Sequence, residues 1–393
     1  MIPIRTTVLG LAHRFNRRII HISRSRRAGN EPAPCSTNQD MKYRTYPYSD
    51  VKVSEVGFGL WTTATGWWGE KTDDEAIAML REAQSLGISL FDAADAYGNG
   101  RSEEQLAKAF GASANARRKI VYATKFGYDF YNHGDERRGQ NEIPHDFSPK
   151  FVRFALEQSL KRLQTDCIDI YQIHNARMEQ IEDDELFELL ETFKREGKIH
   201  MYGVALGPAI GWLYEGVGAV RKRNITSLQI IWNILEQYPG NEQIKAAHTF
   251  PGGSGNPGSD TGYMIRVPHS SGMLEGKYTE DTVFPEKDHR RHRPKSWLIN
   301  GIKKIEQLRF LELPNRTLGQ AAIQWLLAEP RVMSVLPNIY DREQLLEFAA
   351  APDTPPLTKD ELQKIDELFK TNFGIEEPPM TFKGTMDRPT VSA

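Results

Sequence analysis

Eight short apolar runs separated by amphipathic stretches constrain the fold of this chain more than any other feature. The first run begins at residue 53 and the last at residue 331 of the 393-residue sequence. Alternation of strand-like and helix-like segments is typical of βαβ units that build a parallel sheet. The expected strands are VSEVGFG at 53, ISLFDAA at 88, KIVYATKF at 119, CIDIYQIH at 167, KIHMYGVA at 198, SLQIIWN at 227, GYMIRVP at 262 and RVMSVLPN at 331.

Eight strands that are each followed by a helix close most simply into a single (β/α)8 TIM barrel, an α/β fold that commonly takes about 250 residues. Several predicted helices open with a capping box, in which a hydroxyl and a Glu or Gln three residues later bind free amides. The boxes are Thr72/Glu75, Ser102/Gln105, Thr317/Gln320 and Thr358/Glu361, and Ser148-Pro149 marks another helix start. A doubly wound sheet is the alternative, but Gly57-Phe58-Gly59 lacks the spacing of a dinucleotide phosphate loop.

The barrel with its extra helices is expected over residues 41–375, between a basic leader at 1–40 and a C-terminal tail at 376–393. A turn-rich insertion, PGGSGNPGSD, is expected at 251–260. The leader carries seven arginines before its first acidic residue, Glu31. This composition is typical of a mitochondrial transit peptide and also of a disordered basic tail. Met41 is an alternative start without the leader, so we expect a cytoplasmic or mitochondrial protein.

The charge and the cysteine content exclude several classes of function. With 50 Lys and Arg against 52 Asp and Glu, the net charge of −2 provides no field for nucleic acid or an anionic membrane. The 2 cysteines form neither a disulfide framework nor a Cys-rich zinc site, and no HExxH motif indicates another metal. No apolar run approaches the roughly 20 residues that span a bilayer. We therefore expect a soluble protein with a small-molecule partner.

Ionisable side chains stand at the carboxyl ends of three consecutive predicted strands, which is where the active site of a barrel lies. Asp92 ends the second strand, Lys125 the third and His174 the fourth, and Tyr97 follows Asp92 in the same loop. Reduction of a carbonyl requires a proton donor for its oxygen. An ammonium beside a tyrosine makes the phenol a better acid, so Lys125 would activate Tyr97. Asp92 would hold the lysine, and His174 would orient the carbonyl oxygen.

These four residues lie in the sequence blocks FDAADAYGNGRSEEQL, ATKFG and YQIH. The blocks resemble those that carry the Asp, Tyr, Lys and His of the aldo-keto reductase superfamily, in its bacterial and fungal type. The resemblance covers about residues 41 to 369. It implies an NAD(P)-dependent oxidoreductase that reduces an aldehyde or ketone to the alcohol, or catalyses the reverse. Hydride transfer would take place with Tyr97 as the general acid.

The same resemblance implies contacts to a nicotinamide cofactor along the later strands. Gln229 matches a glutamine that contacts the nicotinamide carboxamide, and Arg266 stands where many members have an aromatic that stacks on the ring. A planar guanidinium can stack as well. The segment PHSSGMLEGKY resembles a loop that embraces the pyrophosphate. There the amides of Ser271 and Gly272 would bind phosphate oxygens, assisted by Lys277.

The adenosine end decides between NADP(H) and NAD(H), because a 2′-phosphate favours a cationic partner. Asn338 and Tyr340 stand where the family often has IPGxR or IPGxK, so the usual cation is absent. Arg342 is a substitute if it turns toward the phosphate. Gln344 and Glu347 match positions that contact adenine and ribose. We expect NADP(H), with NAD(H) as a second cofactor and weak discrimination between the two.

The substrate side offers only one candidate with a family counterpart. GFGLW resembles a first-strand block whose last residues line the substrate pocket, which makes Trp61 a candidate pocket wall. Trp67 and Trp68 would extend an aromatic mouth. The segment HRRHRPKSW is expected as a loop that borders this mouth, because its basicity is too local to indicate nucleic acid.

Two alternative functions share this fold. A cofactor-binding regulatory or redox-sensing barrel would have vestigial activity, although the complete tetrad favours catalysis. A Schiff-base lyase or isomerase would use Lys125 as its amine, which leaves Tyr97, Asp92 and Gln229 without a role. The variable loops leave the carbonyl substrate, the physiological direction and the oligomeric state open.

Deletion of residues 1–40 is expected to leave the barrel folded, because its first strand begins only near Val53. If the leader directs import, the shortened protein will stay in the cytosol. Thermal unfolding of both forms checks the fold, and fractionation of cells that express each form checks the location. Full-length, uncleaved protein in the cytosol would contradict import.

Overall fold

The computed structural model describes residues 41–111, 117–134, 142–207, 211–223, 225–249, 261–286 and 288–377, all of which belong to the compact unit Gln39–Ala393. The predicted leader, the insertion at 251–260 and the predicted tail from residue 378 onward lie outside the described residues.

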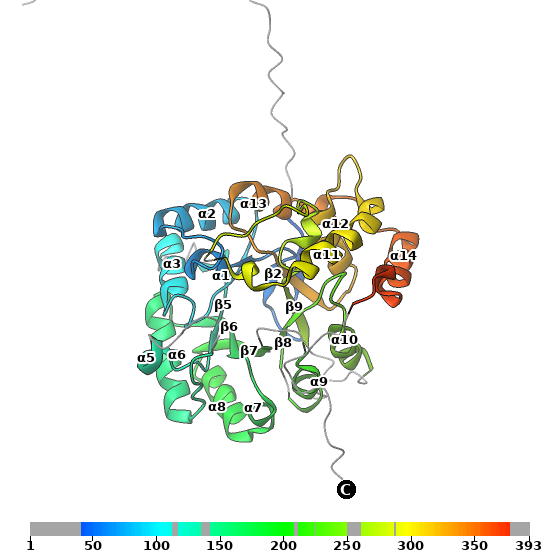
Figure 1. The fold of residues 1–393 in the computed structure, drawn as a ribbon. Coiled ribbons are helices and arrows are strands. Elements are labelled where there is room, and N and C mark those ends of the chain that lie inside the picture. Colours follow the sequence, from blue (N-terminus) through cyan, green and yellow to red (C-terminus); the bar gives the residue numbers. More distant parts are fainter. Residues whose placement is uncertain are drawn as a thin grey trace, which may run out of the picture. The chain divides into compact units, whose positions relative to one another are not determined.

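The centre of this unit is an 8-stranded parallel sheet in the order of the sequence (Figure 1). Its strands are β3 (Phe58–Gly59), β4 (Leu90–Asp92), β5 (Val121–Phe126), β6 (Ile168–His174), β7 (Ile199–Ala205), β8 (Ser227–Ile231), β9 (Gly262–Arg266) and β10 (Val332–Leu336). A parallel bridge between Val56 and Val335 closes the sheet into a barrel, with the Val335 amide bound to Glu55 O at 2.8 Å. All eight predicted strands and the barrel are confirmed.

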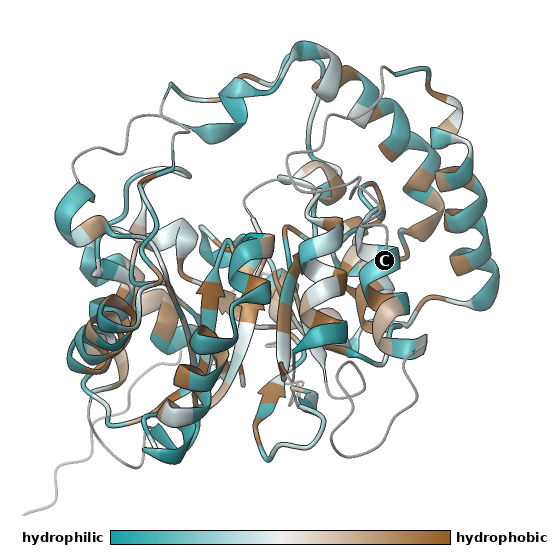
Figure 2. Cartoon of the chain, turned by 90° about the horizontal axis from the view of Figure 1, so that it is seen from below, coloured by the Kyte–Doolittle hydropathy of each residue, from teal (hydrophilic) through white to brown (hydrophobic). Residues whose placement is uncertain are grey.

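Helices surround the barrel, and most of them lie between consecutive strands (Figure 1). They are α1 (Trp61–Ala64), α2 (Asp73–Ser85), α3 (Arg101–Phe110), α5 (Phe130–His133), α6 (Pro149–Leu163), α7 (Met178–Glu182), α8 (Asp184–Arg195), α9 (Leu213–Lys222), α10 (Gly240–Thr249), α11 (Lys295–Leu308), α12 (Leu318–Leu327), α13 (Arg342–Ala349) and α14 (Lys359–Lys370). Short 3-10 helices are η2 (Met273–Glu275), η3 (His289–His292), η4 (Arg309–Leu311), η5 (Ala351–Asp353) and η6 (Asn372–Gly374). Apolar residues gather on the strands and on the helix faces that turn toward them (Figure 2).

Most of the predicted helix starts are confirmed. Thr72, Thr317 and Thr358 each complete a capping box, and Ser148 caps α6 with proline at the first helical position. The prediction of a capping box at Ser102/Gln105 is wrong. Helix α3 begins earlier, after Gly100, which has a φ of 97°, and the Ser102 hydroxyl instead donates to Ala94 O at 2.8 Å.

A β-hairpin covers the amino-terminal end of the barrel. Its strands β1 (Tyr43–Thr45) and β2 (Lys52–Ser54) pair antiparallel, so the first two residues of the predicted first strand belong to the hairpin. Buried side chains from the hairpin pack against the lower interior of the barrel. This cluster consists of Tyr46, Val51, Val53, Leu90, Ala123, Ile170, Met201, Met264, Met333 and Leu336.

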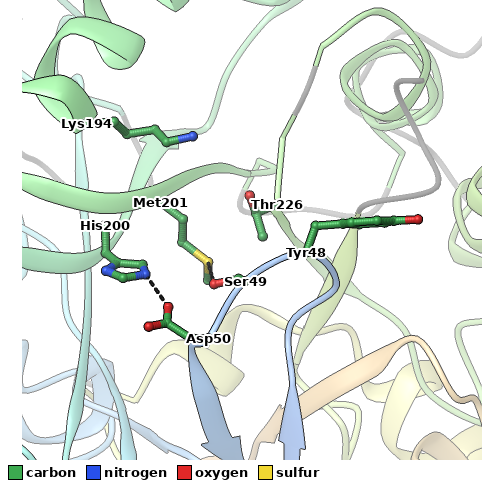
Figure 3. Close-up of a pocket in the computed structure, with 7 residues that line it drawn as sticks. All are labelled: Tyr48, Ser49, Asp50, Lys194, His200, Met201 and Thr226. Atoms are coloured by element: carbon green, nitrogen blue, oxygen red, sulfur yellow. Dashed lines mark hydrogen bonds and ion pairs between the residues drawn. The ribbon is translucent and has the colours of Figure 1, made fainter. Parts of the chain in front are cut away.

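The hairpin turn also borders an open cavity of about 530 Å³ at this end of the barrel (Figure 3). Asp50 from the turn receives a hydrogen bond from His200, at 2.6 Å between Oδ1 and Nε2, and Lys194 and Thr226 line the wall. His200 stands near the beginning of β7 and Thr226 just before β8. The cavity is therefore at the opposite end from the strand termini where barrel enzymes place their chemistry.

Candidate active site

The four candidate catalytic residues meet at the carboxyl end of the barrel. Asp92 is the last residue of β4, Lys125 precedes the last residue of β5, and His174 is the last residue of β6. Tyr97 lies in the loop between β4 and α3 and is 8% exposed. Parallel pairing of the strands aligns their ends, so residues far apart in the sequence form one group.

An ion pair between Asp92 and Lys125 forms the centre of this group. Lys125 Nζ donates to Asp92 Oδ2 at 2.7 Å and to Ala93 O at 2.7 Å, and both side chains are buried. Burial alone lowers the pKa of Lys125, but Asp92 and Tyr97 outweigh it and raise that pKa above its ordinary value. Lys125 is therefore a fixed cation at neutral pH.

Two glutamines bind the second carboxylate oxygen of Asp92. Gln229 Nε2 on β8 donates to Oδ1 at 3.0 Å, and Gln172 Nε2 on β6 donates at 3.2 Å. Gln172 is a site residue that the motifs do not single out. Its position two residues before His174 would have found it, because the period of a strand turns both side chains to the same face.

Tyr97 lies over the ammonium and among other rings. Lys125 Nζ is 4.7 Å from the centroid of the Tyr97 ring. The ring is edge-on to Trp61, with centroids 4.9 Å apart, and to His174, with centroids 5.7 Å apart. A phenol can donate a proton to a bound oxygen, and an imidazole can orient an acceptor oxygen. The arrangement is thus able to deliver a proton to a bound ligand.

A second tyrosine covers the other side of His174. The rings of Tyr128 and His174 meet edge-on, with centroids 4.8 Å apart. The Tyr128 hydroxyl donates to Glu142 Oε1 at 3.0 Å and accepts from the Asn175 amide. Tyr128 also stacks on His145, whose pKa is lowered by burial to about 4, so this imidazole is neutral at pH 7. No sequence motif indicates this wall.

Arg266 at the end of β9 extends the group toward the later strands. Its Nη2 donates to Leu206 O at 2.9 Å and also to Gly207 O, which fixes the guanidinium beside the end of β7. Its buried Nε has no hydrogen-bond partner among the described residues. Gln172 Oε1 is likewise buried and without a partner in the described part of the chain. The site therefore keeps a donor and an acceptor for a ligand.

The loop after β9 offers backbone amides. Ser270, Ser271 and Gly272 have φ values of 47°, 57° and 90°, and the amides of Ser271 and Gly272 donate to no acceptor within the described ranges. Free amides in such a turn bind anions. A β-carbon on Gly272 would lie 2.3 Å from the Tyr278 hydroxyl oxygen, so the turn requires glycine. Arg293 Nη2 reaches Ser271 Oγ at 3.5 Å, a neighbour that the motifs do not identify.

Hydrogen bonds join this loop to the segment after β10. Gln344 on α13 donates from Nε2 to Glu275 Oε2 at 3.0 Å, and its Oε1 accepts from the Tyr340 amide at 3.1 Å. Asn338 lies just beyond β10 and is half-buried. The positions predicted to contact adenine and ribose therefore lie beside the loop predicted to bind phosphate.

The two cations predicted for the phosphates are both paired with carboxylates. Lys277 Nζ lies 3.4 Å from Glu343 Oε1 and 3.4 Å from Glu347 Oε2. Arg342 forms an ion pair with Glu82 on α2 at 2.8 Å, and its side chain is 68% exposed. The structure thus turns Arg342 toward the outer surface of α2.

Aromatic side chains form a cluster between these elements. Trp61 is edge-on to Trp67, with centroids 5.4 Å apart, and Trp68 stacks on Tyr340 at 5.7 Å. His289 from η3 packs against Trp68 at 4.4 Å. The aromatic residues predicted to form a mouth thus pack together, and their role toward a substrate stays a prediction. The predicted loop beside it forms the short helix η3.

The described ranges contain neither a candidate metal site nor a helix that could span a membrane. No group of three or more His, Cys, Asp or Glu side chains there is arranged to hold a metal ion. The described helices include none long and apolar enough to cross a membrane.

Comparison with known families decides what this barrel is. The model of the aldo/keto reductase family matches residues 55–370. The chain belongs to the aldo/keto reductase family. It is therefore an NAD(P)-dependent oxidoreductase, as the tetrad blocks predict.

Relatives of this aldo-keto reductase cover most of its length. The uncharacterized oxidoreductase YqkF of Bacillus subtilis is 30% identical over 336 residues, which are 85% of this chain and 98% of that protein. The NADH-specific methylglyoxal reductase of Escherichia coli is 27% identical over 320 residues, 77% of this chain and 91% of that one. The structure of aldo-keto reductase AKR11C1 from Bacillus halodurans in its holo form superposes with a TM-score of 0.64 at 28% identity, covering 84% and 96% of the two chains.

The polar atoms of this aldo-keto reductase fit a nicotinamide dinucleotide. The free amides of Ser271 and Gly272 suit a diphosphate, and the unpartnered Arg266 Nε and Gln172 Oε1 suit a polar group beside the tetrad.

Replacement of Asp92 by Asn tests the central ion pair. Without the carboxylate, burial dominates and lowers the pKa of Lys125 below that of the unfolded chain. The folded state then binds fewer protons than the unfolded state, so stability rises with pH up to the unfolded pKa of about 10.4. Thermal unfolding between about pH 6 and about pH 9 should show this rise in D92N relative to wild type. Parallel curves for the two proteins would contradict it.

Proposed function

We propose that this aldo-keto reductase reduces an aldehyde or a ketone with Tyr97 as the proton donor. The Lys125 ammonium, held by Asp92 at 2.7 Å and lying 4.7 Å from the Tyr97 ring centroid, is the observation that supports it most directly. A cation at that place can stabilise negative charge that develops as a proton leaves the Tyr97 oxygen during the reaction. Asp92 acts through Lys125, which it keeps charged and in position.

The proton and the hydride reach the carbonyl from different groups. Bound NAD(P)H supplies the hydride to the carbonyl carbon. The Tyr97 hydroxyl gives its proton to the carbonyl oxygen, and His174 donates a hydrogen bond that orients this oxygen. Tyr97 and His174 are only 8% and 7% exposed, which limits competition from water. In the reverse direction the Tyr97 phenolate accepts the proton of the alcohol.

The chain offers separate groups for each part of the cofactor. Gln229 and Arg266 would hold the nicotinamide, and the amides of Ser271 and Gly272 would hold the diphosphate. The adenosine half would then lie along Lys277, Asn338, Tyr340, Gln344 and Glu347. Arg342 points to Glu82 instead, so we propose that either nicotinamide dinucleotide is accepted without a strong preference for NADP(H).

The contacts of Lys125 argue against a Schiff-base mechanism. An amine that attacks a carbonyl must be neutral, whereas Asp92 and Tyr97 raise the pKa of this lysine despite its burial. Turnover distinguishes an enzyme from a regulatory barrel with vestigial activity. It is measured by assaying a panel of aldehydes, ketones, sugars and quinones with NADPH and with NADH.

The leader bears on where the reaction takes place. Seven arginines precede Glu31, and Met41 follows directly before the barrel segment. We propose that the leader directs the protein to mitochondria, the alternative being a cytoplasmic protein translated from Met41. The carbonyl substrate is a small molecule in either case.

Tyr97→Phe is expected to lower turnover by about 10²-fold or more, because only the donated proton is lost. Cofactor affinity should stay unchanged. Tyr202→Phe is the matched control, since the Tyr202 hydroxyl donates to Glu191 on α8 at 2.8 Å, outside the site. Turnover of Tyr97→Phe within about twofold of wild type would remove Tyr97 from its role.

Tyr340→Arg is expected to strengthen NADPH binding, because it restores a cation near the adenosine end. A charge-assisted contact of about 1.5–3 kcal/mol corresponds to about one to two orders of magnitude in the dissociation constant. Arg342→Ala should change neither constant. Titration of both proteins and the wild type with NADPH and NADH measures the constants. A wild type that binds NADPH about a hundredfold more tightly, and loses this margin in Arg342→Ala, would show that Arg342 supplies the charge.

A further inference from the structure

A carboxylate occupies the place where the adenosine half of the cofactor is expected. Glu275 ends η2, and its Oε2 accepts from Gln344 Nε2 at 3.0 Å. Its Oε1 lies 3.4 Å from the position of a β-carbon built on Gly272. One oxygen of Glu275 therefore faces α13 and the other lies beside the amides that would bind the diphosphate.

The cations around Glu275 are engaged by other carboxylates. Lys277 lies between Glu343 and Glu347, at 3.4 Å from each. The Arg290 guanidinium binds both oxygens of Asp288, with Nε at 2.9 Å from Oδ1. In the described part of the chain, Glu275 therefore accepts a hydrogen bond from an amide and forms no ion pair.

The position of this carboxylate follows from the order of the barrel strands. Barrels bind phosphate between the loops after the seventh and eighth strands, and β9 and β10 are these strands here. The Glu275–Gln344 hydrogen bond joins these two loops. If the reactive ring of a dinucleotide lies beside Tyr97 and its diphosphate lies at Ser271, we expect its second nucleoside on the side of Glu275 and α13.

We propose that Glu275 is the residue that sets the choice between NADH and NADPH. Its carboxylate accepts hydrogen bonds from the hydroxyls of the adenosine ribose, and it repels the 2′-phosphate of NADPH. Carboxylates serve this purpose in dinucleotide folds of a different architecture. The assignment rests on the proposed function, because it requires that a nicotinamide dinucleotide occupies this end of the barrel.

The choice between NADH and NADPH depends on pH, because Glu275 can be protonated. Burial raises the pKa of Glu275 to about 7. Glu347 adds to this rise, whereas Gln344, Lys277 and Arg290 oppose it, and Tyr278 and Tyr340 are the other titratable groups that face the carboxylate. A 2′-phosphate favours the protonated carboxyl, so NADPH binding takes up a proton and weakens as pH rises through about 7. Ribose hydroxyls favour the carboxylate, so NADH binding does not weaken.

The test measures dissociation constants by titration, at about pH 6 and about pH 8.5, for the wild type, Glu275→Gln and Glu280→Gln. Glu280 is an exposed residue of the same loop and loses the same charge. The ratio of the NADPH constant to the NADH constant should rise about tenfold with pH in the wild type and in Glu280→Gln. It should rise less than about threefold in Glu275→Gln, because only the titration of the 2′-phosphate near pH 6 remains.

At about pH 8.5, Glu275→Gln should bind NADPH about tenfold more tightly than the wild type. Thermal unfolding confirms that the variant is folded, and Glu275→Thr repeats the measurement if it is not. An unchanged ratio with the same pH dependence in both Glu275 variants would overturn the assignment. Failure of the proposed cofactor site is distinct, since the wild type would then bind neither cofactor, and failure of the proposed reaction is distinct because it shows as absent turnover with cofactor binding retained.

Discussion

The buried ion pair between Asp92 and Lys125 is the interaction on which the rest of the site depends. A buried ammonium without a partner is strongly destabilising, so Lys125 requires the carboxylate. Asp92 in turn has a second oxygen to satisfy, and Gln172 and Gln229 do so at 3.2 and 3.0 Å. These four side chains come from β4, β5, β6 and β8. One hydrogen-bonded group thus joins four of the eight strands, and a shift in any of these strands would disturb the position of Lys125 beside Tyr97.

The sequence predicts this inner part well, because strand periodicity and strand ends are local properties. Apolar runs locate the eight strands, and the last residues of three of them place Asp92, Lys125 and His174 at one end. The misses are also local in origin. Ser102 fits the capping-box pattern, but the helix starts earlier, after the left-handed Gly100. The Ser102 hydroxyl is then inside the helix and donates to Ala94 O, just after β4. The Gln172 side chain follows from the two-residue period once His174 is placed.

The outer part could not be predicted, because it depends on pairs that no local pattern links. Arg342 could face either a phosphate or solvent, and its partner Glu82 lies 260 residues away in the sequence. Glu275 reads as a loop residue until the fold brings Gln344 to it from 69 residues away. The wall of Tyr128 and His145 depends in the same way on how the loop after β5 folds back. The residues at the strand ends therefore indicate the type of reaction, whereas contacts between loops determine which ligands can bind.

Charge is distributed unequally between the inner part around Tyr97 and the outer part around Glu275. At the centre, Asp92 is saturated by Lys125 and two amides, so Lys125 and Arg266 leave an excess of positive charge around the Tyr97 hydroxyl. Negative charge that develops on a carbonyl oxygen is stabilised there. At the rim, Lys277 and Arg342 are paired with carboxylates, and Glu275 adds a negative charge whose ordinary solvation is reduced by burial. We therefore expect a bound dinucleotide to place its reactive ring inward and its adenosine outward.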